Sequence, residues 1–358
     1  QFEMAETQPT ALEVQPAVLE AQPVVADIDV VETTGNWDME MDDFADDKTM
    51  FAGGSGGGMY VSVDGGSNWK PSSEDLVDLD ISGMALSPDF GADGLLVAAT
   101  QAGLYRSVDR GQSWSECVDG FDLDDVRAVA FSSSYSSDST VFAGGALGLT
   151  YRSSDGGWSW NRLSHDFDGE TVVAVATGPD FANDKTVFVG TIGITAAAVH
   201  VSYDGGESFE RFVEHETTTP WVSLGVPGSY SEDDRAWLFS TSSQVFRPTE
   251  RFQDVWTGTY PADSETAVLS IAITPTFTED ATVYAGTSKG VFRSGNGGSG
   301  WSELNQGLKN LAVLKVVASP EYAADHTVFA MALGGEIWRF VDEPETRRGE
   351  VLEPTDIV

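Results

Sequence analysis

Carboxylates at regular spacing are the first residues of this chain that could do chemistry. An eight-residue signature, Ser-x-Asp-x-Gly-x-x-Trp with small variations, begins at Ser62, Ser107, Ser153, Ser202 and Ser294. Its third residue is aspartate in four copies and asparagine in the fifth. Such side chains could hold a metal ion or act in pairs as general acid and base. Catalysis needs one unique constellation, however, so a side chain that recurs in every copy is better explained as a structural element.

The signature has the composition of a tight turn between two strands. Its third residue can accept hydrogen bonds from backbone N–H groups of its own turn, and its glycine supplies a positive φ. The closing aromatic residue offers a large apolar face that neighbouring units can bury. We therefore predict structural roles for Asp64, Asp109, Asp155, Asp204, Asn296, Trp69, Trp114, Trp160, Phe209 and Trp301.

The spacing of the signature predicts the architecture. Successive copies lie 45, 46 and 49 residues apart, and the last gap of 92 residues is two periods, with a degenerate copy at 246–256. A seventh copy lies at 337–342. Each period holds four short β-branched and aromatic runs bounded by turn residues, and no run has helical periodicity. The chain is predicted to be all-β: a seven-bladed β-propeller of four-stranded antiparallel blades over 25–346, with an extended N-terminal tail (1–24) and a C-terminal tail (347–358).

The signature resembles the Asp-box (BNR) repeat, and the resemblance extends over about residues 36–342. This repeat is found in sialidases, sortilin-type receptors, xyloglucan hydrolases and photosystem II assembly factors. The resemblance implies a propeller fold. It does not specify a function, because these relatives do unrelated things.

The enzymatic relatives imply residues that this chain does not provide. Sialidases bind the substrate carboxylate with three arginines, whereas the arginines here share one repeat position, which predicts a structural role. Xyloglucan hydrolases join two propellers around a cleft, whereas the single propeller predicted here lacks the second wall of such a cleft. The loops between strands 2 and 3 contain one charged residue, Lys289, and the innermost strands are small and apolar. We expect these elements to provide no carboxylate or imidazole for acid–base chemistry. We therefore predict a protein that is not an enzyme. The recurring arginines are Arg106, Arg152, Arg247, Arg293 and Arg339.

The net charge of −38, with 57 acidic against 19 basic residues, argues against nucleic acid or an anionic membrane surface as a partner. Acidic residues are concentrated in the connections from strand 4 of one blade to strand 1 of the next (4–1 connections). The loops between strands 1 and 2, on the opposite face, are acidic too, so a generally acidic coat is the better interpretation. The 4–1 residues could also form an acidic face that binds a basic protein partner or Ca²⁺; no other metal or cofactor is expected. The predicted face contains Asp75, Asp78, Asp80, Asp122, Asp124, Asp125, Asp166, Asp168, Glu214 and Glu216.

Two further features concern the compartment of the protein. The single Cys117 excludes an intramolecular disulfide, and no apolar run is long enough to span a membrane. The chain begins at Gln1, which we interpret as the end left by a removed signal peptide. We therefore expect a secreted or cell-surface protein.

The N-terminal tail carries a Gln-Pro dipeptide every seventh residue, which excludes a continuous helix. We predict that residues 25–31 complete blade seven beside residues 336–340. Residues 1–23 could then add as a strand to a neighbouring subunit and give an oligomer or filament. The residues predicted to mediate assembly are Pro9, Leu12, Val14, Pro16, Leu19 and Pro23.

Together these observations predict a secreted or cell-surface, non-catalytic propeller that acts as a protein-interaction or assembly module. One alternative is an accessory or assembly factor of a membrane protein complex. The other is a carbohydrate-active enzyme or lectin, which two carboxylates in a cleft on the ligand face would support. Four aromatic residues of the 4–1 connections could then stack on sugars: Phe121, Phe167, Trp221 and Tyr260.

Overall fold

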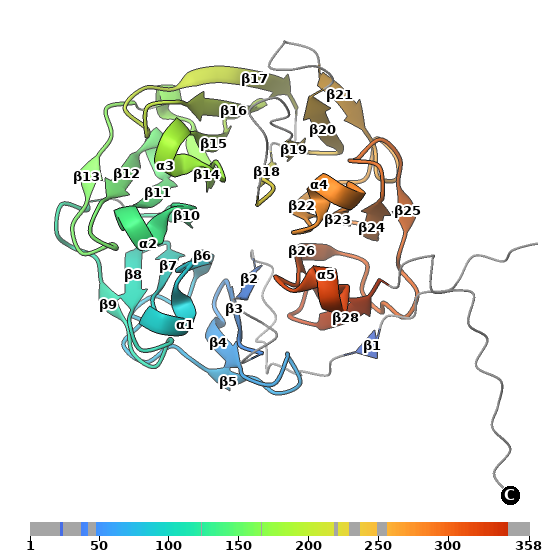
Figure 1. Cartoon of the computed structure of the whole chain (residues 1–358), viewed down its shortest axis with the longest axis horizontal. Helices are drawn as coiled ribbons and strands as arrows, with labels where there is room; N and C mark the ends of the chain where they lie inside the picture. Colours follow the sequence, from blue (N-terminus) through green and yellow to red (C-terminus); the bar gives the residue numbers. More distant parts are fainter. Residues whose placement is uncertain are drawn as a thin grey trace, which may run out of the picture.

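In the computed structural model, seven four-stranded sheets are arranged as blades around a central axis (Figure 1). Every strand pair is antiparallel, and the innermost strand of each blade faces the axis, so the predicted seven-bladed β-propeller is confirmed. The structure describes residues 22–23, 37–41, 48–122, 124–165, 167–217, 221–228, 237–248 and 256–342.

In the first four blades the chain runs from the innermost strand outward. Blade one contains β2 (Trp37–Met41), β3 (Met50–Gly54), β4 (Gly58–Ser62) and β5 (Lys70–Pro71). Blade two contains β6 (Ile81–Leu86), β7 (Leu96–Thr100), β8 (Gly103–Ser107) and β9 (Ser115–Glu116). Blade three contains β10 (Val126–Phe131), β11 (Val141–Gly145), β12 (Thr150–Ser153) and β13 (Asn161–Arg162). Blade four contains β14 (Thr171–Thr177), β15 (Val187–Ile192), β16 (Ala196–Ser202) and β17 (Glu210–Glu216).

The remaining three blades follow the same order. Blade five contains β18 (Val222–Gly225), β19 (Leu238–Thr241), β20 (Gln244–Pro248) and β21 (Trp256–Thr259). Blade six contains β22 (Val268–Ile273), β23 (Val283–Thr287), β24 (Gly290–Ser294) and β25 (Ser302–Glu303). Blade seven contains β26 (Val313–Ala318), β27 (Thr327–Ala332), β28 (Ile337–Val341) and, outermost, β1 (Gln22–Pro23).

An N-terminal strand therefore completes the last blade and closes the ring (Figure 1). In this pairing Gln22 lies opposite Arg339 and Pro23 lies opposite Trp338. An N-terminal strand does complete blade seven, but its two paired residues were assigned to the tail and to contact with a neighbouring subunit, so that assignment was wrong for Gln22 and Pro23. Residues 25–31, for which the pairing was predicted, lie outside the described part of the chain.

Single-turn helices join strands 1 and 2 in five of the blades. Each starts with a buried aromatic residue and ends with an aspartate that fastens the turn. In the first, Asp93 accepts the Leu95 N–H at 2.9 Å and the Ser87 hydroxyl at 2.7 Å. The helices are α1 (Phe90–Asp93), α2 (Tyr135–Asp138), α3 (Phe181–Asp184), α4 (Phe277–Asp280) and α5 (Tyr322–Asp325); two 3₁₀ turns, η1 (Ala146–Gly148) and η2 (Phe167–Gly169), lie elsewhere.

The apolar core is divided among the seven interfaces between blades. Each hydrophobic cluster contains residues of two neighbouring blades. The signature tryptophans belong to these clusters, as predicted: Trp114 packs on blade one and donates its indole N–H to the Ser72 carbonyl at 2.7 Å. Because burial of apolar area is the main stabilising term in folding, the protein is held together chiefly between blades.

The signature turns have the hydrogen bonds expected of structural elements. Asp204 accepts the backbone N–H of Ser208 at 2.9 Å and its hydroxyl at 2.6 Å, and Gly206 has a φ of 93°. The hydrogen bond from the Ser208 hydroxyl is the main cause that lowers the pKa of Asp204 to about 2. Equivalent backbone bonds are made by Asp64, Asp109, Asp155 and Asn296.

The recurring arginines connect each turn to the preceding blade. Arg106 donates to the Gly156 carbonyl at 2.8 Å, and Arg152 donates to the Gly205 carbonyl at 2.9 Å, each in the signature turn of the next blade. Arg247 reaches the Asn296 carbonyl at 2.9 Å in the same way. These side chains are therefore occupied in holding blades together.

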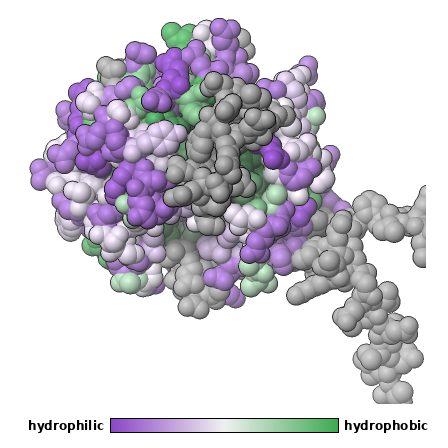
Figure 2. Space-filling model, turned by 45° about the horizontal axis from the view of Figure 1, so that its top comes forward, coloured by the Kyte–Doolittle hydropathy of each residue, from purple (hydrophilic) through white to green (hydrophobic). Residues whose placement is uncertain are grey.

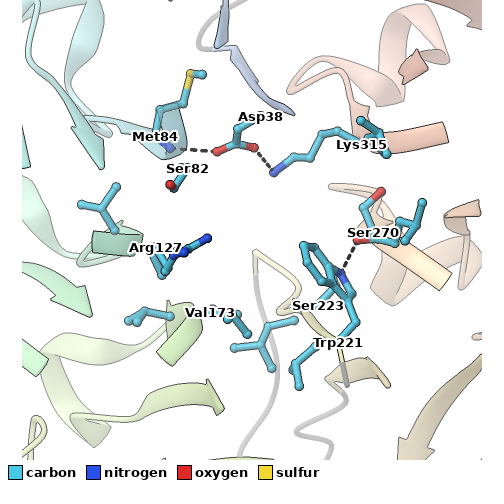
Figure 3. Close-up of a pocket in the computed structure, with 18 of the residues that line it drawn as sticks. Asp38, Ser82, Met84, Arg127, Val173, Trp221, Ser223, Ser270 and Lys315 are labelled. Atoms are coloured by element: carbon cyan, nitrogen blue, oxygen red, sulfur yellow. Dashed lines mark hydrogen bonds and ion pairs between the residues drawn. The ribbon is translucent and has the colours of Figure 1, made fainter. Parts of the chain in front are cut away.

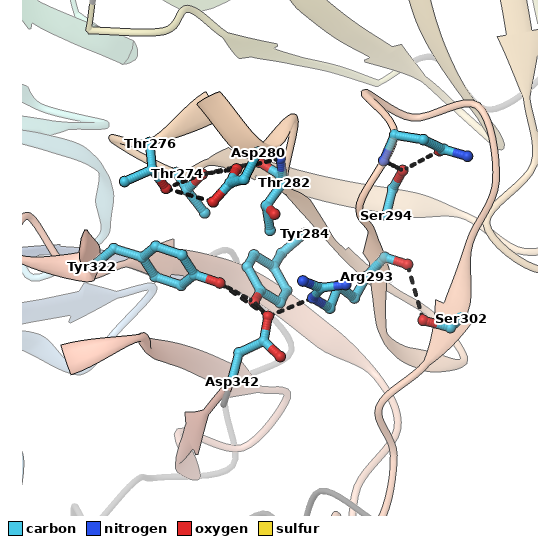
Figure 4. A network of polar contacts seen from close by, with 11 residues as sticks. Thr274, Thr276, Asp280, Thr282, Tyr284, Arg293, Ser294, Ser302, Tyr322 and Asp342 are labelled. Atoms are coloured by element: carbon cyan, nitrogen blue, oxygen red, sulfur yellow. Dashed lines mark hydrogen bonds and ion pairs between the residues drawn. The ribbon is translucent and has the colours of Figure 1, made fainter. Parts of the chain in front are cut away.

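Between blades six and seven the same arginine position is part of a buried polar network (Figure 4). Arg293 forms an ion pair with Asp342, which also accepts the hydroxyls of Tyr284 at 2.6 Å and Tyr322 at 2.9 Å. Burial and the neighbouring Asp342 carboxylate raise the pKa of Tyr284 well above its usual value, so both tyrosines remain donors. One buried carboxylate of blade seven thus binds Tyr322 of its own blade and, across the interface, Tyr284 and Arg293 of blade six.

We expect Asp342→Asn to lower the free energy of unfolding by about 3 kcal/mol, because it leaves Arg293 without its counter-ion in a largely buried site. Chemical denaturation of the purified variant measures this loss. Asp124→Asn, at an exposed aspartate, is the matched control and should change stability little. Equal stability of the two variants would contradict this role for Asp342.

Candidate functional site

The 4–1 connections and the loops between strands 2 and 3 (2–3 loops) lie on the same face of the propeller. The Asp125 N–H donates to the Gln101 carbonyl of the preceding blade at 2.7 Å, and the Ala146 N–H donates to the Asp125 carbonyl at 3.1 Å. Leu333 and Ala312 are joined in the same way in blade seven. We call this the 4–1 face. The innermost strands begin here, so the mouth of the central channel opens among these connections.

A cavity of about 430 Å³ occupies this end of the channel (Figure 3). Its walls come from the innermost strands of all seven blades or from the residues next to them. Most of the wall is small or apolar, as predicted, but four charged side chains and one tryptophan also line it. These are Asp38, Glu40, Arg127, Lys315 and Trp221.

Three of the charged residues meet where blade one meets blade seven. Lys315 Nζ, on β26, lies 2.6 Å from Asp38 Oδ1 and 3.5 Å from Glu40 Oε1, both on β2. The second oxygen of Asp38 accepts the Met84 N–H of blade two at 2.8 Å (Figure 3). Asp38 therefore contacts residues of blades two and seven from blade one, directly at the seam where the ring closes.

The pKa values of Glu40 and Lys315 are shifted from their usual values. Burial raises the pKa of Glu40 to about 7; the Lys315 ammonium lowers it and the Asp38 carboxylate raises it. Burial lowers the pKa of Lys315, but the two carboxylates more than offset that effect and leave the pKa above its usual range. A third of the Glu40 side chain remains accessible from the cavity. Near neutral pH, Glu40 can therefore gain or lose a proton.

Two other side chains shape the remaining wall. Arg127 extends from β10 into the cavity, and its Nε lies 2.5 Å from Asp125 Oδ1. Trp221 precedes β18 and donates its indole N–H to the Leu269 carbonyl at 2.6 Å, which fixes the position of its ring (Figure 3). The cavity thus combines paired charges with one aromatic surface.

Small, apolar innermost strands are evident in the sequence of blades two, three, four and six, and this pattern does not extend to blades one and seven. The innermost strands of blades one and seven carry charge: β2 reads Trp-Asp-Met-Glu-Met, and β26 contains Lys315. Alternation along β2 was the available signal, because residues two apart point to the same side of a strand. The expectation that these strands provide no carboxylate was wrong at Asp38 and Glu40.

Much of the predicted acidic face is engaged in local contacts. Asp78 accepts the backbone N–H groups of Asp80 and Ala102, and Asp80 accepts the Ser55 hydroxyl. Several others bind a neighbouring side chain: Asp122 with Tyr151, Asp125 with Arg127, and Asp168 and Glu214 with Arg211. Asp75, Asp124 and Glu216 are exposed, whereas Asp166 lies outside the described residues.

Within the described chain, no group of three or more His, Cys, Asp or Glu side chains is placed to hold a metal ion. The Ca²⁺ alternative therefore gains no support from these loops. Cys117 and the group formed by Thr191, His200 and Glu170 contain side chains that could act as nucleophiles, but both are enclosed in the fold. Cys117 is buried, and burial raises its pKa to about 12. Thr191, between His200 and Glu170, is fully buried, and burial lowers the pKa of His200 to about 4, so this group offers no accessible nucleophile.

The four aromatic residues considered for sugar stacking have different surroundings. Phe121 packs on Tyr151 and Trp160, and Phe167 is buried. Trp221 lines the cavity, and Tyr260 is exposed. Of the predicted assembly residues, only Pro23 is described, in β1; Pro9, Leu12, Val14, Pro16 and Leu19 lie outside the described range.

Comparison with known proteins places this chain among propellers by structure alone. No family model matches its sequence. No curated protein matches it either. Three solved propellers resemble it at 14–17% identity, and similarity at this level concerns the fold.

None of the helices in the described ranges is long and apolar enough to cross a membrane.

The similar structures differ in length and in activity. YCF48 bound to D1 peptide matches with a TM-score of 0.64, covering 92% of this chain and 99% of that one. An ancestral GH74 enzyme matches at 0.67 over 92% of this chain but only 47% of its own. The extracellular domain of BT4673 from B. thetaiotaomicron matches at 0.65 over 91% of this chain and 40% of its own. This chain therefore spans less than half the length of the last two.

We expect opposite stability effects from the two carboxylates of β2. Asp38→Asn should cost about 2 kcal/mol, because it removes the charge that holds Lys315 at the seam. Glu40→Gln should be neutral or stabilising at pH 8, because the pKa of Glu40 in the folded protein, about 7, lies above the ordinary glutamate value of 4.5. Ionised Glu40 is therefore unfavourable in the folded protein. The advantage of Glu40→Gln should shrink as the pH falls toward 4.5.

Thermal unfolding of both variants between pH 4.5 and 8 measures these effects. A destabilised Glu40→Gln variant at pH 8 would contradict the cost assigned to ionised Glu40.

Proposed function

We propose that this protein is a non-catalytic interaction module that binds a segment of a partner protein on the 4–1 face, over the mouth of the central cavity. The observation that carries the proposal is the cavity itself, which all seven blades form and which contains a fixed tryptophan and paired charges. Polar side chains elsewhere in the ring are mostly occupied in holding turns and blades. The side chains that line the cavity differ from blade to blade, so they can form one unique binding site.

The surroundings of the cavity favour a basic and partly apolar partner. The 2–3 loops expose apolar side chains: Ile194 is 94% exposed, and Leu147 is 69% exposed. Asp75, Asp124 and Glu216 of the 4–1 connections are exposed as well. A peptide with alternating basic and apolar side chains could bury the exposed apolar side chains of the 2–3 loops and neutralise the acidic side chains of the 4–1 connections.

Solved propellers support an interaction role in general terms. The YCF48 structure, which has nearly the length of this chain, holds a D1 peptide, so one propeller of this size can present a peptide site. An accessory role in the assembly of a membrane protein complex is a narrower form of the proposal. Figure 2 shows many hydrophilic residues on the visible surface, which carries the single-turn helices and not the 4–1 face.

The compartment and the assembly state remain part of the proposal. An extracellular or cell-surface location fits the acidic composition and the extracellular domain among the similar structures. Self-assembly through the N-terminal tail would extend the strand pairing begun by β1 at the outer edge of blade seven.

The partner chemistry can be tested with an array of short capped peptides. Peptides that alternate basic and apolar residues should bind, acidic versions of the same peptides should not, and added salt should weaken binding. Ile194→Ser and Leu147→Ser should each reduce affinity about fivefold, because each removes exposed apolar contact area. Val63→Ser is the matched control, since Val63 is 65% exposed in a signature turn on the opposite face. An equal loss with Val63→Ser would contradict the assignment of the face.

A second candidate function is carbohydrate binding or hydrolysis. It is favoured by Asp38 and Glu40, two carboxylates that share one cavity on the 4–1 face and one lysine. Glycosidases use such a pair, and the raised pKa of Glu40 suits a general acid. Trp221 would offer the stacking surface that sugars prefer.

Incubation with soluble polysaccharides and aryl glycosides distinguishes the two candidates. A non-catalytic module should release no product. Turnover that falls at least about 100-fold in both Glu40→Gln and Asp38→Asn would establish the hydrolase instead. Turnover that persists in both variants would indicate a contaminating activity, which leaves the non-catalytic proposal in place.

A further inference from the structure

Among the described residues of the central cavity and their partners, the charges do not balance. Arg127 is matched by Asp125, with Nε–Oδ1 and Nη2–Oδ2 separations of 2.5 and 3.1 Å. Lys315 is matched by Asp38 at 2.6 Å. Glu40 is the third carboxylate of the group, and it shares Lys315 with Asp38: Lys315 Nζ lies 3.5 Å from Glu40 Oε1 but 2.6 Å from Asp38 Oδ1. The group therefore carries one negative charge more than its cations neutralise when Glu40 is ionised.

We propose that the cavity accepts one cationic group, a guanidinium or a primary ammonium on a basic side chain of the partner, with Glu40 as its counter-ion. An anion is disfavoured, because it would have to displace a carboxylate that already lies within 2.6 Å of each cation. A neutral ligand would leave the charge of Glu40 uncompensated. One bound cation would neutralise the excess negative charge.

The walls of the cavity suit such a group. Trp221 is held by its bond to Leu269, so its indole ring is already placed along the wall, and aromatic faces attract guanidinium and ammonium groups. Ser82, Ser223 and Ser270 add hydroxyl groups to the lining. The volume of about 430 Å³ lies within the usual range of ligand pockets.

The neighbours of Glu40 determine how this site responds to pH. The charged groups that face the cavity are Asp38 on β2, Lys315 on β26 and Arg127 on β10. Burial raises the pKa of Glu40 to about 7, so acidification removes the charge that the guest needs. Binding should therefore weaken as the pH falls from 8 to 5, and a bound cation should in turn lower the pKa of Glu40.

This inference rests on the proposed function only in placing the basic group on a partner protein. The cavity can be tested without a partner, using n-butylguanidinium chloride as the probe and n-butylurea as its neutral isostere. We expect the full chain to bind the guanidinium and not the urea in NMR titrations. Glu40→Gln should weaken binding at least about tenfold, while Glu265→Gln, at an exposed glutamate, should not change it.

A second variant keeps the test independent of any effect of Glu40→Gln on folding. Lys315→Met removes a competing cation, so it should tighten binding of the guanidinium if the cavity works as inferred. Equal binding of n-butylurea, unchanged binding in Glu40→Gln, or weaker binding in a folded Lys315→Met variant would overturn the inference. Failure of the probe with intact peptide binding on the 4–1 face would overturn this inference alone. Intact probe binding with no peptide binding would overturn the proposed function.

Discussion

Closure of the ring is the constraint on which the rest of this structure depends. Each blade buries its apolar surface only against its two neighbours, so the first and last blades would be open ends if they did not meet. At their seam Trp69 packs with a cluster that includes Phe329 and Ile337, while β1 pairs with β28. On the axis, Lys315 binds Asp38. Apolar packing, strand pairing and an ion pair thus close the ring at three distances from the axis.

The same constraint explains why so many charged residues have no role in chemistry. A ring of similar blades needs the same turn and the same contact between blades several times. The signature aspartates hold the turns, the helix-terminal aspartates hold the connections between strands 1 and 2, and arginines such as Arg106 tie one blade to the next. The acidity of the chain is therefore partly a property of the scaffold. Residues that differ between blades are not needed for the repeated turns and contacts, so they are the ones available for binding.

The candidate site is itself a consequence of closure. Asp38 and Glu40 meet Lys315 only because blade one lies beside blade seven, so the most perturbed charges of the channel lie on the seam. A ligand that contacts Glu40 would act on the same group of charges that joins the first and last blades. Binding and stability are coupled there by linkage, since any group that binds only the folded ring also favours its closure.

The sequence by itself determined the blade count, the turn chemistry and the structural roles of residues such as Asp204 and Trp114, because these depend on local spacing and recur in five of the seven units. The alternation along β2 could also have placed Asp38 and Glu40 on one side of a strand, but the prediction of small, apolar innermost strands overlooked it. The sequence could not show that Lys315, near the other end of the chain, supplies their cation, or that Arg127 already has Asp125 as its partner. Those pairings depend on which strands meet around the axis, and distances across a closed ring exist only once the ring has formed.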